Sequence, residues 1–217
     1  VTSIKGGNGN DKITITNVPA NAVIDGGAGN DELVIKGSSA TTLQPTLTNI
    51  EKVTIDGNTA DLTLSLKKAE SVTELSFANL SKKVTESNGN VDTVNFLAGN
   101  SEASSAQVTI SDATLKTINF VDADKAVKGN IAADKATELT INSGKVEAAA
   151  NAVVTAASAT KIDINAAKDT AGLTLTAGKL TDLTVNNKGA FALTGTSFDS
   201  IKNLNVNAEG KFSIATA

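Results

Sequence analysis

Two glycine-rich stretches near the N-terminus carry the residues best suited to chemistry. Residues 6–14 read Gly-Gly-Asn-Gly-Asn-Asp-Lys-Ile-Thr, and residues 26–34 read Gly-Gly-Ala-Gly-Asn-Asp-Glu-Leu-Val. Both match the nonapeptide pattern G-G-x-G-x-D-x-U-x, in which U is an apolar residue. The glycines allow the backbone to direct carbonyl oxygens at one point, and the aspartate adds a carboxylate. Such oxygen ligands are those that calcium prefers.

The spacing of the two nonapeptides predicts one ion held between them. Asp11 and Asp31 occupy the same position of the two motifs, and the step between them is close to the period of the rest of the chain. Calcium takes about six to eight oxygens, of which one loop supplies roughly half. We therefore expect the loops to stack and share a calcium ion, and its removal to loosen this region because stacked carboxylates repel. The expected ligands are the carboxylates of Asp11 and Asp31 and the carbonyls of Gly6, Asn8, Gly26 and Ala28, with Asp25 able to cap the edge.

Glycine turns without a metal are the alternative interpretation of these stretches. Weaker echoes of the motif occur later in the chain, where acidic or amide groups remain but the glycine spacing is lost. We interpret these echoes as solvated turns. They are Asp56-Gly57-Asn58 with Asp61, Asn88-Gly89-Asn90 with Asp92, and Asp122 with Asp124.

The elements that position the motif repeat with a period of about 21 residues, a spacing typical of solenoid repeats. A six-residue cassette recurs eight times. It consists of an apolar residue, two spacer residues, and then an apolar, a polar and an apolar residue. Its middle residue is polar in every copy, which is typical of a strand with one buried face. The central apolar residues are Val53, Leu75, Val94, Ile118, Leu139, Ile162, Leu183 and Leu204.

Most units carry a second short strand half a period later, most clearly at 62–66, 108–110, 173–176, 191–194 and 212–214. One coil cannot bury its own apolar side, so successive coils are expected to stack with like residues over like. We expect asparagines to hydrogen-bond to their copies at coil corners in left-handed conformations. The predicted columns are Phe77, Phe96 and Phe120; Phe191 and Phe212; and Asn142, Asn165, Asn186 and Asn207.

These patterns predict an all-β fold, a parallel β-solenoid of the β-helix or β-roll type with coils of about 21 residues. Residues 1–57 would form calcium-binding coils, and residues 58–217 would continue the same rod. An antiparallel β-sandwich also has short alternating strands, but it gives no reason for this period and would need hairpin turns. Residues 146–159 are alanine-rich enough to allow a helical turn or a small excursion.

The composition restricts the available chemistry to oxygen ligands. The chain has 19 Lys, no Arg, 23 acidic residues, no Cys and no His, with a formal net charge of −4. The missing residues exclude disulfides, the usual zinc sites, Ser-His-Asp triads and bidentate phosphate recognition. The acidic balance argues against a nucleic-acid partner. No apolar run is long enough for a transmembrane helix.

The nonapeptides, followed by Thr/Asn/Ala-rich cassettes such as residues 47–55, resemble the repeats-in-toxin (RTX)-type surface-layer proteins of Gram-negative bacteria, of the Caulobacter and Campylobacter kind. The resemblance implies type I secretion and an extracellular location at the cell surface. It also implies a calcium-ordered two-dimensional lattice held to lipopolysaccharide. No anchoring segment or secretion signal is visible, so we expect a piece of a longer chain, with lipopolysaccharide bound by other parts.

Three functions compete at this stage. The first is a non-enzymatic lattice subunit whose partners are copies of itself. The second is a binding or stalk module of a secreted RTX adhesin, with rows of Thr and Asn facing outward. The third is a polysaccharide-active β-helix enzyme using Asp122, Asp124 or Asp163; we disfavour it because Lys is the only available base partner.

Overall fold

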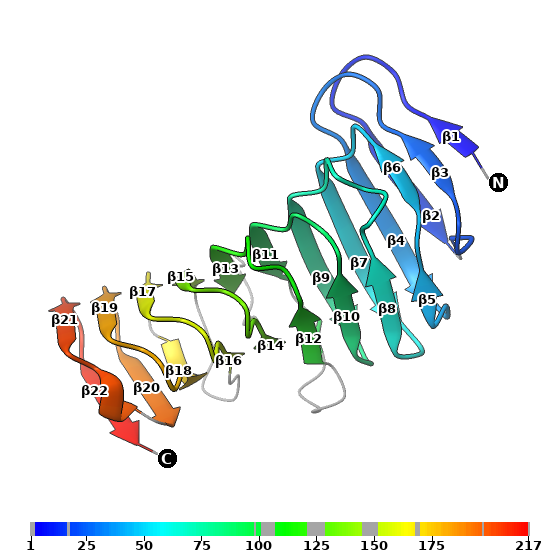
Figure 1. Cartoon of the computed structure of the whole chain (residues 1–217). Helices are drawn as coiled ribbons and strands as arrows, with labels where there is room; N and C mark the ends of the chain where they lie inside the picture. The colour runs from blue at the N-terminus through cyan, green and yellow to red at the C-terminus, as the bar shows by residue number, and fades with distance from the viewer. Residues whose placement is uncertain are drawn as a thin grey trace.

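A computed structural model describes residues 3–16, 18–97, 99–100, 107–120, 129–144, 152–167, 170–196 and 198–216. Every strand pairing in this described part is parallel, and the strands form a β-solenoid of about nine coils spaced about 21 residues apart. The predicted fold class is therefore confirmed. Figure 1 shows the coils stacked into one rod, with the N-terminal and C-terminal strands at opposite ends.

A ten-stranded sheet runs the length of the rod, a nine-stranded sheet begins at residue 42, and a short third sheet covers the N-terminal coils. The ten-stranded sheet contains β2 (Lys12–Thr16), β4 (Glu32–Ser38), β7 (Lys52–Asn58), β9 (Glu74–Leu80), β11 (Thr93–Phe96), β13 (Thr117–Phe120), β15 (Glu138–Ser143), β17 (Lys161–Ala166), β19 (Asp182–Asn187) and β21 (Asn203–Ala208). The nine-stranded sheet contains β5 (Thr42–Leu43), β8 (Leu62–Ser65), β10 (Val84–Ser87), β12 (Gln107–Ile110), β14 (Gly129–Ala132), β16 (Ala152–Thr155), β18 (Thr170–Thr176), β20 (Phe191–Thr196) and β22 (Phe212–Thr216). The third sheet contains β1 (Ser3–Lys5), β3 (Val23–Asp25) and β6 (Thr46–Thr48).

The core lies between the sheets and consists of columns of like side chains. Phe77, Phe96 and Phe120 are buried on successive coils, with ring centroids 5.8 and 4.9 Å apart. Phe191 and Phe212 stack at 6.0 Å. Both predicted aromatic columns are confirmed, because parallel in-register pairing places each residue over its copy in the next coil.

The register differs from the predicted cassette alignment at one step. Ile118 pairs with Ile141, two residues beyond the expected Leu139, and Phe120 consequently pairs with Ser143. A shift of two residues keeps every side chain on the same face of the sheet. It also places Asn119 beside Asn142, which extends an amide column that the expected register would have broken.

The asparagine column is confirmed, but its predicted position at coil corners is wrong. From Asn119 onward, each Nδ2 donates to the Oδ1 of the asparagine in the preceding coil at 2.7–2.9 Å. These asparagines lie within extended strands, whereas the asparagines with positive φ are Asn49, Asn79 and Asn88. Strand positions suit the ladder because the amide spacing then equals the strand spacing. The column comprises Asn95, Asn119, Asn142, Asn165, Asn186 and Asn207.

Replacing Asn165 by alanine should cost about 1–2 kcal/mol of unfolding free energy, because Asn142 Oδ1 loses its donor and Asn186 Nδ2 loses its acceptor. Urea denaturation would measure the loss. Asp163→Ala on the same strand is the control, since its carboxylate is partly exposed and lies 3.8 Å from Lys161 Nζ; we expect it to cost less than about 0.5 kcal/mol. Equal losses would show that the ladder does not stabilise the rod.

The alanine-rich stretch is not helical where the structure describes it. Ala152–Thr155 form β16 of the nine-stranded sheet, and residues 145–151 lie outside the described part. The helical turn that this composition allows does not occur at Ala152–Thr155, where parallel neighbours on both sides supply the backbone partners. No helix of the described residues has the length and apolar character needed to cross a membrane.

The outer face of the ten-stranded sheet changes along the rod. In the N-terminal coils lysines and acids alternate at one position, with Lys12 Nζ 2.9 Å from Glu32 and Lys52 Nζ 3.1 Å from Glu74. Burial opposes ionisation of Glu32, but hydrogen bonds from Thr54 and Lys12 outweigh it and lower the pKa of this carboxyl. In the next coils threonines occupy this position, at Thr93, Thr117 and Thr140, and the amide column runs beside them two residues further along each strand.

Candidate metal centre

The two glycine-rich loops stack directly on each other. The first joins β1 to β2 and the second joins β3 to β4, so each links the third sheet to the ten-stranded sheet. Asn8 pairs with Ala28, the Ala28 N–H donates to Gly7 O at 3.0 Å, and the Gly9 N–H donates to Ala28 O at 2.5 Å. The loops therefore occupy equivalent positions in adjacent coils, as their spacing predicts.

The two aspartates are linked through the backbone. The Gly7 N–H donates to Asp11 Oδ2 at 2.8 Å, and the Asp11 N–H donates to Asp31 Oδ1 at 2.7 Å. Asp31 is fully buried, and no described residue donates a hydrogen bond to its Oδ2. A buried carboxylate oxygen without a donor is costly, so Asp31 Oδ2 is the atom that most clearly lacks a ligand.

Glycine is required at the start of each loop because oxygens occupy the space that a side chain would take. A Cβ on Gly6 would overlap the Gly26 carbonyl oxygen and lie 2.9 Å from Asp11 Oδ2. A Cβ on Gly26 would overlap both the Asn49 carbonyl oxygen and Asp31 Oδ2. The same pairing of one carbonyl with one carboxylate thus recurs on successive coils.

The carbonyl groups differ in their availability as ligands. Among the described residues, no hydrogen bond uses the carbonyls of Gly6, Asn8 or Gly26. The Ala28 carbonyl already accepts from Gly9, which leaves one of its two lone pairs. No three Asp, Glu, His or Cys side chains converge on a metal-sized site within the described residues. A cation here would therefore draw mainly on backbone oxygens together with the two carboxylates, and this donor set fits a hard ion such as calcium.

The structure adds residues that the nonapeptide pattern does not include. The Asp31 N–H donates to Glu51 Oε2 at 2.7 Å, so Glu51 continues the acidic column into the third coil. Asp25 Oδ1 accepts from Gly27 N and from Asn49 Nδ2, both at 3.1 Å, and thereby braces the second loop against the third coil. The glycines that mark the first two loops are absent before Glu51. The only sequence signal for Glu51 was therefore its spacing from Asp31, which equals the spacing from Asp11 to Asp31.

The later echoes of the motif are only partly solvated turns. Asn58 is buried, and its Oδ1 accepts from Ser81 N and Lys82 N of the next coil, so the solvated-turn interpretation is wrong for this residue. Asp61 does lie in an exposed turn, where it accepts from Lys83 N. Near Gly89 the turn lies against Glu86 of its own coil and Asp112 of the next coil. Asp122 and Asp124 lie outside the described residues.

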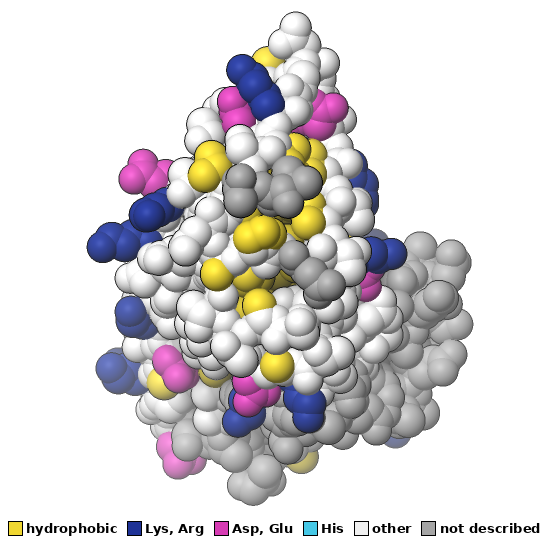
Figure 2. All heavy atoms as spheres, turned by 90° about the vertical axis from the view of Figure 1, so that its right-hand side faces the viewer, with side chains coloured by type: hydrophobic (Ala, Val, Ile, Leu, Met, Phe, Trp, Pro, Cys, Tyr) yellow, Lys and Arg dark blue, Asp and Glu magenta, His cyan; other side chains and the backbone are white. Residues whose placement is uncertain are grey.

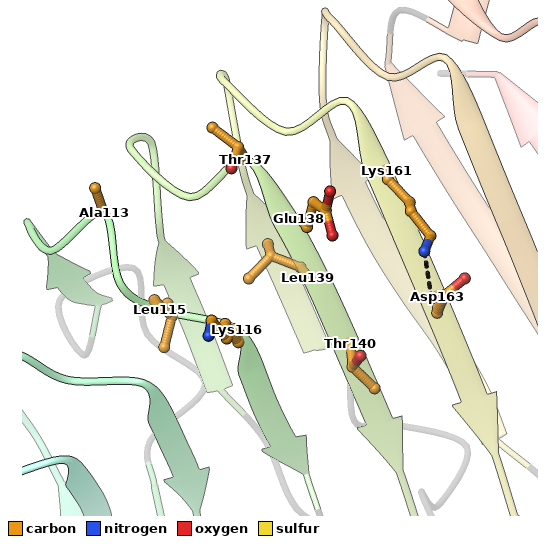
Figure 3. A pocket seen from close by; sticks show the side chains of 9 residues that line it. All are labelled: Ala113, Leu115, Lys116, Thr137, Glu138, Leu139, Thr140, Lys161 and Asp163. Carbon is orange, nitrogen blue, oxygen red and sulfur yellow. Dashed lines mark ion pairs between the residues drawn. The ribbon is translucent and has the colours of Figure 1, made fainter.

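A hollow of about 320 Å³ lies on the outer face of the ten-stranded sheet, beside the register shift. Figure 3 shows Lys116, Glu138, Lys161 and Asp163 around it. Asp163, one of the candidate catalytic acids, lies 3.8 Å from Lys161 Nζ, and the two side chains are 35% and 52% exposed. Such exposure provides no water-excluding environment for acid–base chemistry, so the glycine loops remain the stronger candidate site.

Comparison with known protein families, curated proteins and solved structures yields no match for this chain. Its function must therefore be inferred from the solenoid and the geometry of the two glycine loops.

Proposed function

We propose that this chain is a structural segment of a calcium-dependent bacterial surface layer, an RTX-type protein that is exported by type I secretion and assembles with copies of itself outside the cell. The observation that supports this best is the stacked loop pair, in which buried Asp31 Oδ2 lacks a partner among the described residues and adjacent carbonyls accept no hydrogen bond from them. Calcium bound there would neutralise the carboxylates and tie the first two coils together.

A lattice subunit needs rigidity and repeated contact surfaces, and the rod offers both. Parallel ladders with in-register side-chain columns resist bending, and the outer sheet face repeats its charges and amides from coil to coil. The ends of the described rod add apolar surface: Leu204 is 47% and Ile214 is 42% exposed at the C-terminal side. Figure 2 looks at the N-terminal side and shows hydrophobic side chains gathered centrally among polar and charged ones. The open sheet edges at the two ends of the described rod favour contacts with further domains or copies.

The alternative function is a stalk in a secreted adhesin. Strands of the N-terminal and C-terminal coils lie at opposite ends of one continuous rod, which is the arrangement needed to hold a binding domain away from a surface (Figure 1). In that case calcium would stiffen a single rod without bringing copies together. In the surface-layer role, lipopolysaccharide would be bound through parts of the protein outside this segment.

The two functions can be separated by titrating calcium into the purified chain and following it by electron microscopy and small-angle scattering. A lattice subunit should form sheets or ordered filaments only with calcium, and magnesium at equal ionic strength should not replace it. Monodisperse rods at every calcium concentration would favour the stalk. Cleavage of a uronate polymer by the chain would contradict both structural roles.

A further inference from the structure

A second pair of acidic residues lies far from the glycine loops, in the middle of the rod. Glu86 is the third residue of strand β10 and faces inward, and Asp112 follows β12 in the next coil. Glu86 is fully buried and Asp112 is 7% exposed. Along the same inward column the neighbours of Glu86 are Leu64 and Ile110. A carboxyl group therefore occupies a position that apolar side chains fill in the adjacent coils, which requires a specific explanation.

Hydrogen bonds account for three of the four carboxyl oxygens. Asp112 Oδ1 accepts from Gly89 N at 3.1 Å, and Asp112 Oδ2 accepts from Val91 N at 3.0 Å. Glu86 Oε2 accepts a longer bond of 3.3 Å from Ser111 N. Glu86 Oε1 is buried, and no described residue donates to it. Asp112 therefore has a backbone donor on each carboxyl oxygen, whereas Glu86 has one long hydrogen bond on a single oxygen.

The unpartnered oxygen and an oxygen of Asp112 both lie beside Gly89. A Cβ placed on Gly89 would lie 2.9 Å from Asp112 Oδ2, 3.0 Å from Glu86 Oε1 and 3.0 Å from Leu66 Cδ1. Two carboxyl oxygens from adjacent coils thus converge on one glycine, under an apolar side chain. A proton on Oε1 would both remove the second charge and provide the missing hydrogen bond.

We propose that Glu86 and Asp112 share one proton, held on Glu86 Oε1 and donated to Asp112 Oδ2, and that its loss loosens the turn at residues 88–92. This device lies outside the calcium loops and does not depend on the proposed surface-layer role. It makes the middle of the rod sensitive to pH, because two unscreened negative charges would then face each other at the contact between two coils.

The surroundings of the pair contain no compensating charge among the residues that the structure describes. β8 presents Leu64 and β12 presents Ile110 toward Glu86, and the facing strands β9, β11 and β13 present apolar side chains. Buried residues in the described part of the chain include no lysine. Burial, and then the charge of Asp112, raise the pKa of Glu86 to about 7, and the backbone N–H groups of Ser111 and Gly89 only partly oppose them. Asp112 is the single charged group that acts on Glu86 among these contributions.

The sign of the pH effect follows from the raised pKa. Between the ordinary glutamate range near 4.5 and about 7, the folded chain retains a proton that the unfolded chain has released. Stability from this group is therefore complete below that window and is lost as the pH rises through it. The unfolding equilibrium constant should rise by up to about tenfold per pH unit within the window.

The test combines a site-specific titration with a variant that mimics the protonated state. The ¹³C carboxyl resonance of Glu86 in the wild-type chain should titrate near pH 7 in EDTA. Glu86→Gln keeps the shape and carries an N–H donor, so its urea denaturation should lack the pH-dependent loss between pH 5 and 8. Glu138→Gln, at an exposed strand position, should retain the wild-type slope.

Any one of three other outcomes would overturn the proposal. A Glu86 carboxyl that titrates in the ordinary range would show that no proton is held. A Glu86→Gln chain with the wild-type slope would place the pH dependence elsewhere. A Glu86 resonance that moves on adding calcium at pH 8 would show that a divalent cation, and not a proton, joins the two carboxyl groups. The NMR titration needs no variant and stays decisive even if Glu86→Gln fails to fold.

Discussion

Chelation of calcium is expected to lower the melting temperature of the wild-type chain and to leave that of Asp31→Asn unchanged. At free calcium 100-fold above the dissociation constant, binding to the folded state adds about 2.7 kcal/mol. For a chain of this size that corresponds to roughly 5–10 °C. Asparagine keeps the acceptor for the Asp11 N–H but removes the charge of a fully buried carboxylate. Differential scanning calorimetry with and without EDTA would measure both effects.

The same variant should behave in the opposite way when calcium is absent. Wild-type Asp31 Oδ2 then stays buried without a donor among the described residues, whereas the asparagine side chain carries one charge less. We expect Asp31→Asn in EDTA to be at least as stable as the wild type, with a gain of up to about 1–3 kcal/mol. Asp61→Asn is the matched control, since Asp61 accepts from Lys83 N in an exposed turn and should not alter the calcium response. A wild-type calcium response in Asp31→Asn would exclude this residue as a ligand.

The coil architecture could be predicted because two independent periods agree. Alternation within each cassette predicts strands with one buried face, and the regular recurrence of the cassette predicts that such strands stack. The aromatic columns follow from these two facts alone. The alignment of Ile118 with Leu139 could not be corrected in this way, because a shift of two residues buries the same face. The choice between the registers depends on the amide ladder, whose bonds form only between neighbouring coils.

The candidate metal centre was predictable to the extent that glycine marks it. The match between the Asp11-to-Asp31 step and the coil period correctly predicted stacked loops. Glu51 and Asn49 were missed in the sequence analysis because the third coil has no glycine motif. At the corresponding turn Asn49 adopts the left-handed conformation, with a φ of 52°. Glu86 was missed for a different reason: in a short strand an acid is normally assigned to the outer face, and its partner Asp112 belongs to the next coil.

Phe96→Ala should give the largest loss of stability in the chain, about 3–5 kcal/mol. Phe96 is 1% exposed and is the middle ring of the aromatic column, with contacts to Phe77 and Phe120. Gly129 also packs against its ring, since a Cβ there would lie 2.5 Å from Phe96 Cδ1. Alanine would therefore remove two ring contacts and leave a cavity enclosed by rigid strands. Urea denaturation followed by circular dichroism would measure the loss.

The position of this cavity should also change how the rod unfolds. Each coil of a solenoid contacts only its neighbours, so a weakened coil in the middle uncouples the coils on either side of it. Phe96→Ala should unfold in two steps, and hydrogen exchange should show faster opening of β9, β11 and β13 than of β17 and β19. Phe212→Ala is the control, because Phe212 is only partly buried and has one ring partner, Phe191, at 6.0 Å. Its loss should be smaller and its unfolding should remain a single step. If both variants lost the same free energy in one transition, the stability of the rod would not be carried by nearest-neighbour coil contacts.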